Sequence, residues 1–241
     1  AEHGWMDITG AGGGIMEAGH RVAGRDASMG LYIMLPFEQS ANPFIDGDPK
    51  LVTLKYFFTR KLMFVKECSA VVCLPGGFGT LDEALETLTL MQTGKQTVLP
   101  LVLLDHEGGS YWSDLGGFIE KQLLGNGMIS PEDVHLYKIT SSIDEAIDEM
   151  LGFYAVYHSM RYVKDRLVLR LKQRLSEQKL AHIQDHYAEI LVEGTFEQRK
   201  ALPEEAGEPD LEDLPRLVFH FDRRALGRLR MLIDCINGRG E

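Results

Sequence analysis

The chain has 241 residues, 44% of them apolar, so it is long enough to bury a sizeable core. Its 36 acidic residues outnumber its 25 lysines and arginines, and the net charge of -11 disfavours general binding to nucleic acid or to an anionic membrane. Three cysteines without metal-ligand spacing favour a reducing cytoplasm. The sequence has no signal-peptide pattern and no apolar run near the roughly 20 residues that span a bilayer, so we expect neither secretion nor a membrane segment.

The first residues of the sequence resemble the middle of an alternating strand and helix pattern. Residues 1–4 resemble a helix end that runs into a strand at 5–9, so we expect a preceding strand and helix outside this sequence. A glycine-rich turn at 10–14 then opens a helix, with a layout similar to a dinucleotide fingerprint but without its full spacing. Glu17 falls in the first turn of that helix, where it either complements the helix dipole or contacts a ligand.

Strand and helix patterns continue to alternate along the chain. Residues 30–35 predict a strand closed by a proline, residues 37–51 a loop, and residues 56–67 a helix. Arg60 and Lys61 lie in the middle of this helix. They are either its solvated side or, because their neighbours are apolar, residues that need an acidic partner or a phosphate.

The chain is organised around one motif, a strand at 70–74 followed by a turn at 75–79 and a helix from Thr80 to about residue 91. Unpaired N–H groups and the positive end of the dipole at such a helix start attract anions, so we expect a phosphate site. Thr80 and Glu83 fit a capping box, which is the structural interpretation. The glycines of the turn are not needed for a cap but let a ligand approach the backbone closely, so both interpretations stay open.

The alternation extends to about residue 151. The patterns predict strands at 97–104 and 136–140, and helices at 111–124 and 142–150. Ser141 or Ser142 is expected to cap the last of these helices. This order predicts an α/β fold with a doubly wound parallel sheet over residues 1–151.

Residues 152–241 differ in composition and are expected to form a small C-terminal α+β extension. It is predicted to contain strands at 166–171 and 216–221, a helix marked by an apolar stripe at 180–191, a solvated acidic linker near 203–215, and a final helix capped by Asp222. Among the eight histidines we expect neither an H-x-x-x-H nor an H-E-x-x-H grouping, so no catalytic metal is implied.

Two motifs together resemble a known family. The pair Arg60-Lys61 and the stretch Pro75-Gly76-Gly77-Phe78-Gly79-Thr80-Leu81-Asp82-Glu83 are similar to the R-K and P-G-G-x-G-T-x-x-E signatures of the Lonely Guy family, often mislabelled lysine decarboxylases. The similarity runs from about Trp5 to Leu151, and residues 12–18 look like the longer bacterial branch. The resemblance implies a Rossmann-like homodimer or higher oligomer that needs no cofactor. Such an enzyme hydrolyses the N-glycosidic bond of a cytokinin riboside 5′-monophosphate.

The resemblance also assigns roles to residues. It implies that Arg60 and Glu83 are the catalytic pair and that Lys61 lines the site. A carboxylate suits this reaction, because glycosidic cleavage passes through an oxocarbenium-like state. The expected substrate-binding residues are Gly13, Gly14, Glu17, Lys61, Gly76, Gly77, Gly79, Thr80 and Thr89, of which Gly76, Gly77, Gly79 and Thr80 hold the 5′-phosphate.

The chain departs from the short plant members in two places. Phe57-Phe58-Thr59 stands before the R-K pair where those members have a histidine, which bears on the preferred base, and residues 152–241 have no counterpart in them. Two other functions are compatible with the motifs: a broader purine or pyrimidine nucleotide nucleosidase, or a nucleotide- or cofactor-binding carrier that does not cleave. Arg60 and Glu83 favour an enzyme, since a carrier would need the phosphate loop but not this pair.

Overall fold

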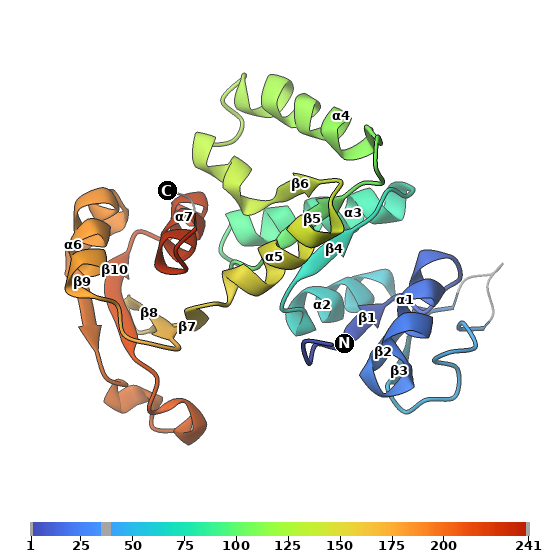
Figure 1. The fold of residues 1–241 in the computed structure, drawn as a ribbon, viewed down its shortest axis with the longest axis horizontal. Coiled ribbons are helices and arrows are strands. Elements are labelled where there is room, and N and C mark those ends of the chain that lie inside the picture. Colours follow the sequence, from blue (N-terminus) through green and yellow to red (C-terminus); the bar gives the residue numbers. More distant parts are fainter. Residues whose placement is uncertain (1, 35–39, 240–241) are drawn as a thin grey trace. The chain divides into compact units, whose positions relative to one another are not determined.

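The computed structural model describes residues 2–34 and 40–239 (Figure 1). These residues form two compact units, which are divided between Cys68 and Ser69. Each unit contains a parallel three-stranded sheet with helices, so the α/β class is confirmed. No helix among these residues is long and apolar enough to cross a membrane. The expected domain boundary at residue 151 stays a prediction.

The first unit has a sheet in the order β1-β2-β3, with β2 in the middle. Its strands are β1 (Asp7–Thr9), β2 (Ser28–Ile33) and β3 (Leu51–Leu54), and its helices are α1 (Ile15–Ala23) and α2 (Phe57–Glu67), with a 3₁₀ turn at Arg25–Ala27. The strands predicted at 5–9 and 30–35 are confirmed as β1 and β2, although β2 ends at Ile33, and the helix predicted at 56–67 is confirmed as α2. Residues 35–39 lie outside the described parts. The strand β3 was missed, because a polar stretch rich in proline masks its short apolar run.

The second unit begins with a parallel sheet in the order β4-β5-β6. Its elements are β4 (Val71–Cys73), α3 (Phe78–Gln92), β5 (Leu101–Leu104), α4 (Tyr111–Phe118), a π-helical turn (Ile119–Leu124), a 3₁₀ helix (Pro131–Leu136), β6 (Lys138–Thr140) and α5 (Ile143–Phe153). The central strand β5 starts directly after Pro100 and is almost wholly buried, as expected for a parallel strand covered on both faces. Ser142 caps α5 by accepting a hydrogen bond from the Glu145 N–H, as predicted.

The C-terminal part of the second unit is a four-stranded antiparallel sheet in the order β7-β8-β10-β9. Its elements are β7 (Tyr157–Val163), β8 (Arg166–Leu171), α6 (Glu177–His186), β9 (Leu191–Arg199), two 3₁₀ turns (Pro203–Glu205 and Pro209–Leu211), β10 (Arg216–Phe221) and α7 (Leu226–Ile236). The predicted strands at 166–171 and 216–221 are confirmed. The helix predicted from the apolar stripe at 180–191 is too long, because α6 ends at His186 and Leu191 belongs to β9.

The last helix starts later than its sequence suggested. We expected Asp222 to cap it, but α7 begins at Leu226 with Ala225 as its N-cap residue and no side-chain cap. The Asp222 carboxylate instead accepts hydrogen bonds from the N–H groups of Arg224 and Ala225, at 2.9 and 3.1 Å. Asp222 therefore stabilises the turn that leads into the helix. The exact first residue of a helix is the feature that a sequence pattern predicts least well.

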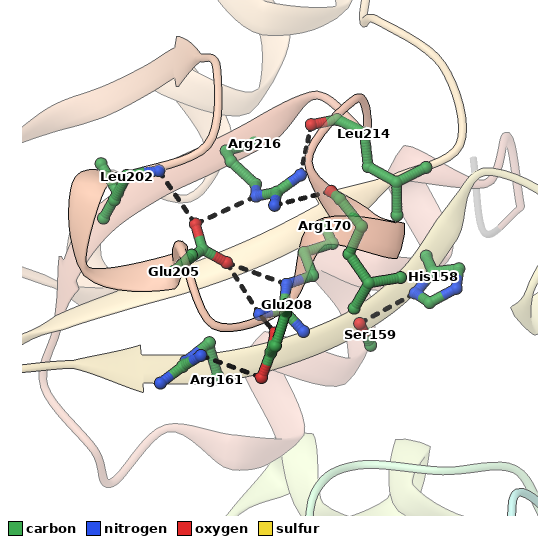
Figure 2. Close-up of polar contacts among 10 residues, drawn as sticks. His158, Ser159, Arg161, Arg170, Leu202, Glu205, Glu208, Leu214 and Arg216 are labelled. Carbon is green, nitrogen blue, oxygen red and sulfur yellow. Dashed lines mark hydrogen bonds and ion pairs between the residues drawn. The ribbon is translucent and has the colours of Figure 1, made fainter.

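A buried ion cluster fixes the acidic segment at 203–215 to the C-terminal sheet (Figure 2). Most of this segment is exposed, but Glu205 is only 3% exposed. Its carboxylate accepts hydrogen bonds from Arg170 Nε at 2.9 Å, from Arg216 Nε at 3.1 Å and from the Leu202 N–H at 3.1 Å. Burial alone would raise the pKa of Glu205, but these hydrogen bonds outweigh it and leave the pKa below its usual value.

Candidate functional site

The Pro-Gly-Gly turn leads from β4 into α3, as the sequence predicts, but the helix starts earlier than expected. Gly77 is the N-cap residue, Phe78 is the first helical residue, and no side chain caps the helix. Thr80 is therefore the third residue of α3, and it does not form a capping box with Glu83. The cap interpretation of these two residues is wrong, because Gly77, with an extended backbone, is already the N-cap residue, three positions before Thr80.

Thr80 and Glu83 lie on one face of α3. They are three residues apart in the helix, so their side chains project from neighbouring turns on the same side. Thr80 also packs back on the turn: a Cβ placed on Gly76 would collide with its hydroxyl oxygen and lie 3.0 Å from its Cβ. The structure thus brings Gly76 and Thr80 together within the second unit, with Glu83 about one turn further along the same face of α3. Gly77 and Gly79 have open space where a side chain would stand.

Tyr111 holds the Pro-Gly-Gly turn from the first residue of α4. Its hydroxyl donates a hydrogen bond to the Gly76 carbonyl oxygen at 2.8 Å. The start of α4 is fixed in turn by Asp105, whose carboxylate accepts from the Trp112 N–H at 3.3 Å. Burial alone would raise the pKa of Asp105, but hydrogen bonds from the Trp112 and His106 N–H groups outweigh this effect and leave the pKa below its usual value. Sequence reasoning missed Tyr111, because 35 residues separate it from the turn.

Thr89 lies away from this turn, near the end of α3. Its side chain is exposed, and its hydroxyl donates to the Leu85 carbonyl oxygen at 2.8 Å, which is a common arrangement for threonine within a helix. Its assignment to the substrate site stays a prediction.

The glycine turn of the first unit leads from β1 into α1, as predicted. Gly14 is the N-cap residue of α1 with φ +68°, a backbone conformation that favours glycine, and no side chain caps this helix either. Gly13 is exposed and lies beside the first-turn acid Glu17, whose carboxylate oxygen is 4.0 Å from the place of a Gly13 Cβ. Both interpretations of Glu17 therefore fit its position.

Arg60 packs against the start of the same glycine turn. Its Nε donates to the Leu31 carbonyl oxygen at 2.9 Å, and its guanidinium carbon lies 5.2 Å from the centre of the Phe64 ring. A side chain on Gly10 would collide with the guanidinium. Arg60 is half-buried, so the interpretation of Arg60 as a solvated surface residue is wrong. Lys61, the next residue of α2, is also half-buried.

No group of three or more metal-binding side chains occurs within residues 2–34 and 40–239. α6 carries a histidine pair, His182 and His186, whose rings stack with centroids 4.0 Å apart. This pair has H-x-x-x-H spacing, so the expectation that the histidines lack this grouping is wrong. Two stacked imidazoles do not supply the three or more protein ligands that a catalytic zinc site uses.

Two strands end in glycine turns, each of which opens a helix without a side-chain cap, and this arrangement defines the chain as an α/β protein with two strand-turn-helix units. The profile of a family described as "Possible lysine decarboxylase" matches residues 10–150. The chain belongs to this family, the Lonely Guy family that its two motifs resemble.

Curated relatives agree with the family. Two cytokinin riboside 5′-monophosphate phosphoribohydrolases of Arabidopsis thaliana are similar to the chain. LOG1 is 37% identical over 91 residues, which cover 38% of this chain and 41% of the relative, and LOG3 is 42% identical over 72 residues, covering 30% and 32%. A probable enzyme of the same name from Oryza sativa subsp. japonica, LOGL3, is 35% identical over 99 residues, covering 41% and 44%. The chain thus spans less than half of the length of these relatives.

Proposed function

We propose that this protein hydrolyses the N-glycosidic bond of a nucleoside 5′-monophosphate and releases the free base and ribose 5-phosphate. The observation that carries the proposal is the Pro-Gly-Gly turn, which opens α3 without a side-chain cap and has Thr80 and Glu83 on one helix face. The relatives' names, which give cytokinin riboside 5′-monophosphates as substrates, support the same reaction and favour an adenine-type base with a cytokinin side chain.

The phosphate is proposed to bind at the start of α3. A helix of 15 residues whose first N–H groups have no side-chain acceptor offers both hydrogen-bond donors and the positive end of its dipole to an anion. Glycine at positions 77 and 79 leaves the backbone open to close approach. Thr80 adds a hydroxyl at the third helical position.

Glu83 is the proposed catalytic carboxylate. Anchoring the phosphate at the helix start puts the ribose near the next turn of the same face, where Glu83 stands. A carboxylate there stabilises positive charge as the bond from C1′ to the base nitrogen breaks, and it can accept the proton of the water that adds to C1′. The departing base takes up a proton and C1′ gains a hydroxyl group, so the reaction consumes one water.

Arg60 is proposed as the second catalytic residue, and Lys61 as a residue that lines the substrate site. The Arg60 guanidinium is held by the Leu31 carbonyl and packed on Gly10, which is a fixed position for a cation that assists a charged substrate. Gly13, Gly14, Glu17 and Thr89 complete the proposed substrate contacts.

The finer assignments of fold and assembly belong to the same proposal. We propose a Rossmann-like doubly wound sheet for residues 1–151, a C-terminal extension at 152–241, a homodimer or higher homo-oligomer, and a cytoplasmic location. The parallel strand pairing within the sheets β1-β2-β3 and β4-β5-β6 supports the proposed Rossmann-like sheet.

A base-release assay tests the proposal. The protein is incubated with isopentenyladenosine 5′-monophosphate, AMP, a pyrimidine 5′-monophosphate and the matching nucleosides, and free base is separated and quantified. We expect base from at least one 5′-monophosphate and none from the nucleosides, because the phosphate site would be empty. Release from several bases at similar rates indicates the broader nucleosidase. Binding of all nucleotides without product overturns the enzymatic proposal and leaves the carrier.

A further inference from the structure

His20 and Asn42 are buried polar side chains that the proposed reaction does not use. His20 is fully buried in α1, and Asn42, in the segment between β2 and β3, is 5% exposed. Burying an imidazole and an amide is unfavourable unless their polar atoms are hydrogen-bonded. In this unit they are, and Asn42 contacts the glycine turn that precedes α1 directly.

Asn42 holds two consecutive carbonyl groups of the glycine turn. Its backbone N–H donates to the Ala11 carbonyl oxygen at 2.8 Å, and its side-chain Nδ2 donates to the Gly12 carbonyl oxygen at 3.1 Å. The amide oxygen Oδ1 accepts from the Phe44 N–H at 3.2 Å. That contact fixes which way the amide faces, so Nδ2 is directed at the turn.

His20 supports the same orientation of the amide. Its Nε2 lies 3.2 Å from the Met29 carbonyl oxygen and 2.9 Å from the Thr9 hydroxyl oxygen. Because a carbonyl oxygen only accepts, the proton belongs on Nε2, which leaves Nδ1 as an acceptor. Nδ1 lies 3.1 Å from Asn42 Nδ2, so both hydrogens of the Asn42 amide have acceptors.

The backbone of the turn needs such support. Ala11 has φ +59°, in the left-handed region that costs a residue with a side chain roughly 1–2 kcal/mol. Ala11 is fully buried, and its N–H donates to the Thr9 hydroxyl at 3.0 Å while its carbonyl is held by Asn42. The contacts of Asn42 and Thr9 therefore hold an unfavourable conformation in place.

Holding the carbonyl groups sets the direction of the N–H groups. In a planar trans peptide the carbonyl and the N–H point in opposite directions, and the described residues contain no cis peptide. The Gly12 and Gly13 N–H groups belong to the two peptides whose carbonyls face Asn42, so both point away from it. No residue in the described parts of the chain accepts a hydrogen bond from either of them.

We propose that Asn42, oriented by His20, is a positioning residue that presets the Gly12 and Gly13 N–H groups to bind an oxygen atom of the nucleotide. The inference rests on the proposed function, because it needs a nucleotide at this turn. It adds a specific role for two residues that lie outside both family motifs. Without Asn42 the two peptides are free to rotate, and the nucleotide must order them when it binds.

The Asn42→Asp variant tests this role with almost no change in size. It replaces the Nδ2 donor with an oxygen atom that faces the Gly12 carbonyl oxygen, so that carbonyl loses its partner. We expect KM for the best 5′-monophosphate to rise about tenfold, equivalent to about 1.4 kcal/mol, with a smaller change in kcat. Asn126→Asp is the matched control, since Asn126 donates to the Gln122 carbonyl oxygen from an exposed position outside the site.

A pair of His20 variants keeps the inference testable if Asn42→Asp does not fold. The amide oxygen of His20→Asn stands where Nδ1 stood and still accepts from Asn42, whereas His20→Gln reaches the Nε2 position and loses that acceptor. Both leave a similar gap, so a purely structural role predicts equal effects. We expect a several-fold higher KM for His20→Gln than for His20→Asn, and equal KM values would overturn the inference.

The outcomes separate this inference from the proposed function. If the wild-type protein releases no base, the proposed reaction fails, and the dissociation constants of AMP measured by calorimetry then decide whether Asn42 positions a nucleotide site. If the wild-type protein is active and Asn42→Asp keeps the wild-type KM, the proposed reaction stands and the role of Asn42 is refuted.

Discussion

Glu83 is the residue on which the proposed chemistry depends most directly. Glu83→Gln keeps the size and hydrogen-bonding capacity of the side chain but removes the negative charge that stabilises the transition state. We expect kcat to fall by a factor of about 10²–10³ or more, with nucleotide binding retained. Single-turnover kinetics and calorimetry with the same nucleotide measure the two effects separately.

A control for this variant is Glu177→Gln, because Glu177 is a glutamate in the first turn of another helix, α6, where it is exposed. It should keep the wild-type rate. Wild-type kcat in Glu83→Gln would remove the residue from the mechanism and leave the phosphate turn as a binding device only.

Tyr111 offers a test that removes a single atom. Tyr111→Phe deletes the hydroxyl that donates to the Gly76 carbonyl and leaves the ring in place. A neutral hydrogen bond contributes about 0.5–1.5 kcal/mol, so we expect KM for the nucleotide to rise roughly 2- to 10-fold with little change in melting temperature.

Tyr187→Phe is the matched control for Tyr111→Phe, since the Tyr187 hydroxyl also donates to a backbone carbonyl, that of Met231 at 3.1 Å, but in the C-terminal part. It should alter stability rather than KM. A KM that is unchanged in Tyr111→Phe, or changed equally in both variants, would show that the hydroxyl does not act through the turn.

At the scale of elements, the helices that follow glycine turns were the most predictable part of this fold. The glycine-rich turn at 10–14 identified α1, and apolar periodicity identified α3 as well as α2, which follows no glycine turn; the apolar run before Pro75 identified β4. Helix boundaries were less predictable. The start of α3 is set by the backbone conformation of Gly77, whereas the residue types at Thr80 and Glu83 suggested a later start.

The contacts that hold the turns were not predictable from the sequence. Tyr111 and Asn42 contact the glycine turns from segments about 30 residues away, and neither belongs to a local motif. The glycines indicated places where a ligand can approach the backbone closely. The side chains that hydrogen-bond to the carbonyl groups of these turns depend on how distant segments pack, so the sequence does not reveal them. Glu205 was missed for the same reason, since its burial comes from arginines on two separate strands.

At the start of α3, one substitution can separate an effect on stability from an effect on substrate binding. Gly79 is helical and has no atom within 4 Å of the place of its Cβ, so Gly79→Ala fits the folded chain. Alanine favours a helix over glycine by roughly 0.5–1 kcal/mol, so the melting temperature should stay the same or rise. If the phosphate approaches this backbone as proposed, the added methyl group should nevertheless raise KM several-fold.

Gly76→Ala is the contrasting variant, because its Cβ would collide with Thr80 and should lower both stability and activity. Thermal unfolding and steady-state kinetics on both variants distinguish the two cases. A Gly79→Ala protein with wild-type KM would contradict a phosphate at this position.

At the scale of the whole second unit, the C-terminal part shares its core with the parallel sheet that precedes it. Met91 and Leu101 from the sheet region and Leu229 and Leu232 from α7 belong to one buried cluster. Asn237, just after α7, accepts from the Val156 and Tyr157 N–H groups at 2.8 and 2.9 Å and donates to the Phe153 carbonyl at 2.6 Å. The extension therefore stabilises the same unit that contains the Pro-Gly-Gly turn and Glu83.

This shared core makes the ion cluster around Glu205 important for the stability of the unit. Glu205→Gln removes the charge that faces Arg170 and Arg216, both of which are buried. Breaking a buried ion pair on one side typically lowers the free energy of unfolding by about 3–5 kcal/mol at neutral pH. Glu204→Gln is the adjacent control, because Glu204 pairs with Lys164 at the surface and should change stability little.

The effect of Glu205 should depend on pH with a defined sign. Its pKa is lowered in the folded protein, so its contribution is fully present above the pKa of about 4.3 that glutamate has in the unfolded chain, and it is lost as the pH falls through the folded-state value. Denaturant unfolding at several pH values should therefore show the largest difference between wild type and Glu205→Gln near neutrality, and a narrowing difference below about pH 4. A constant difference, or equal losses in the two glutamate variants, would mean that Glu205 stabilises the sheet through packing rather than through its charge.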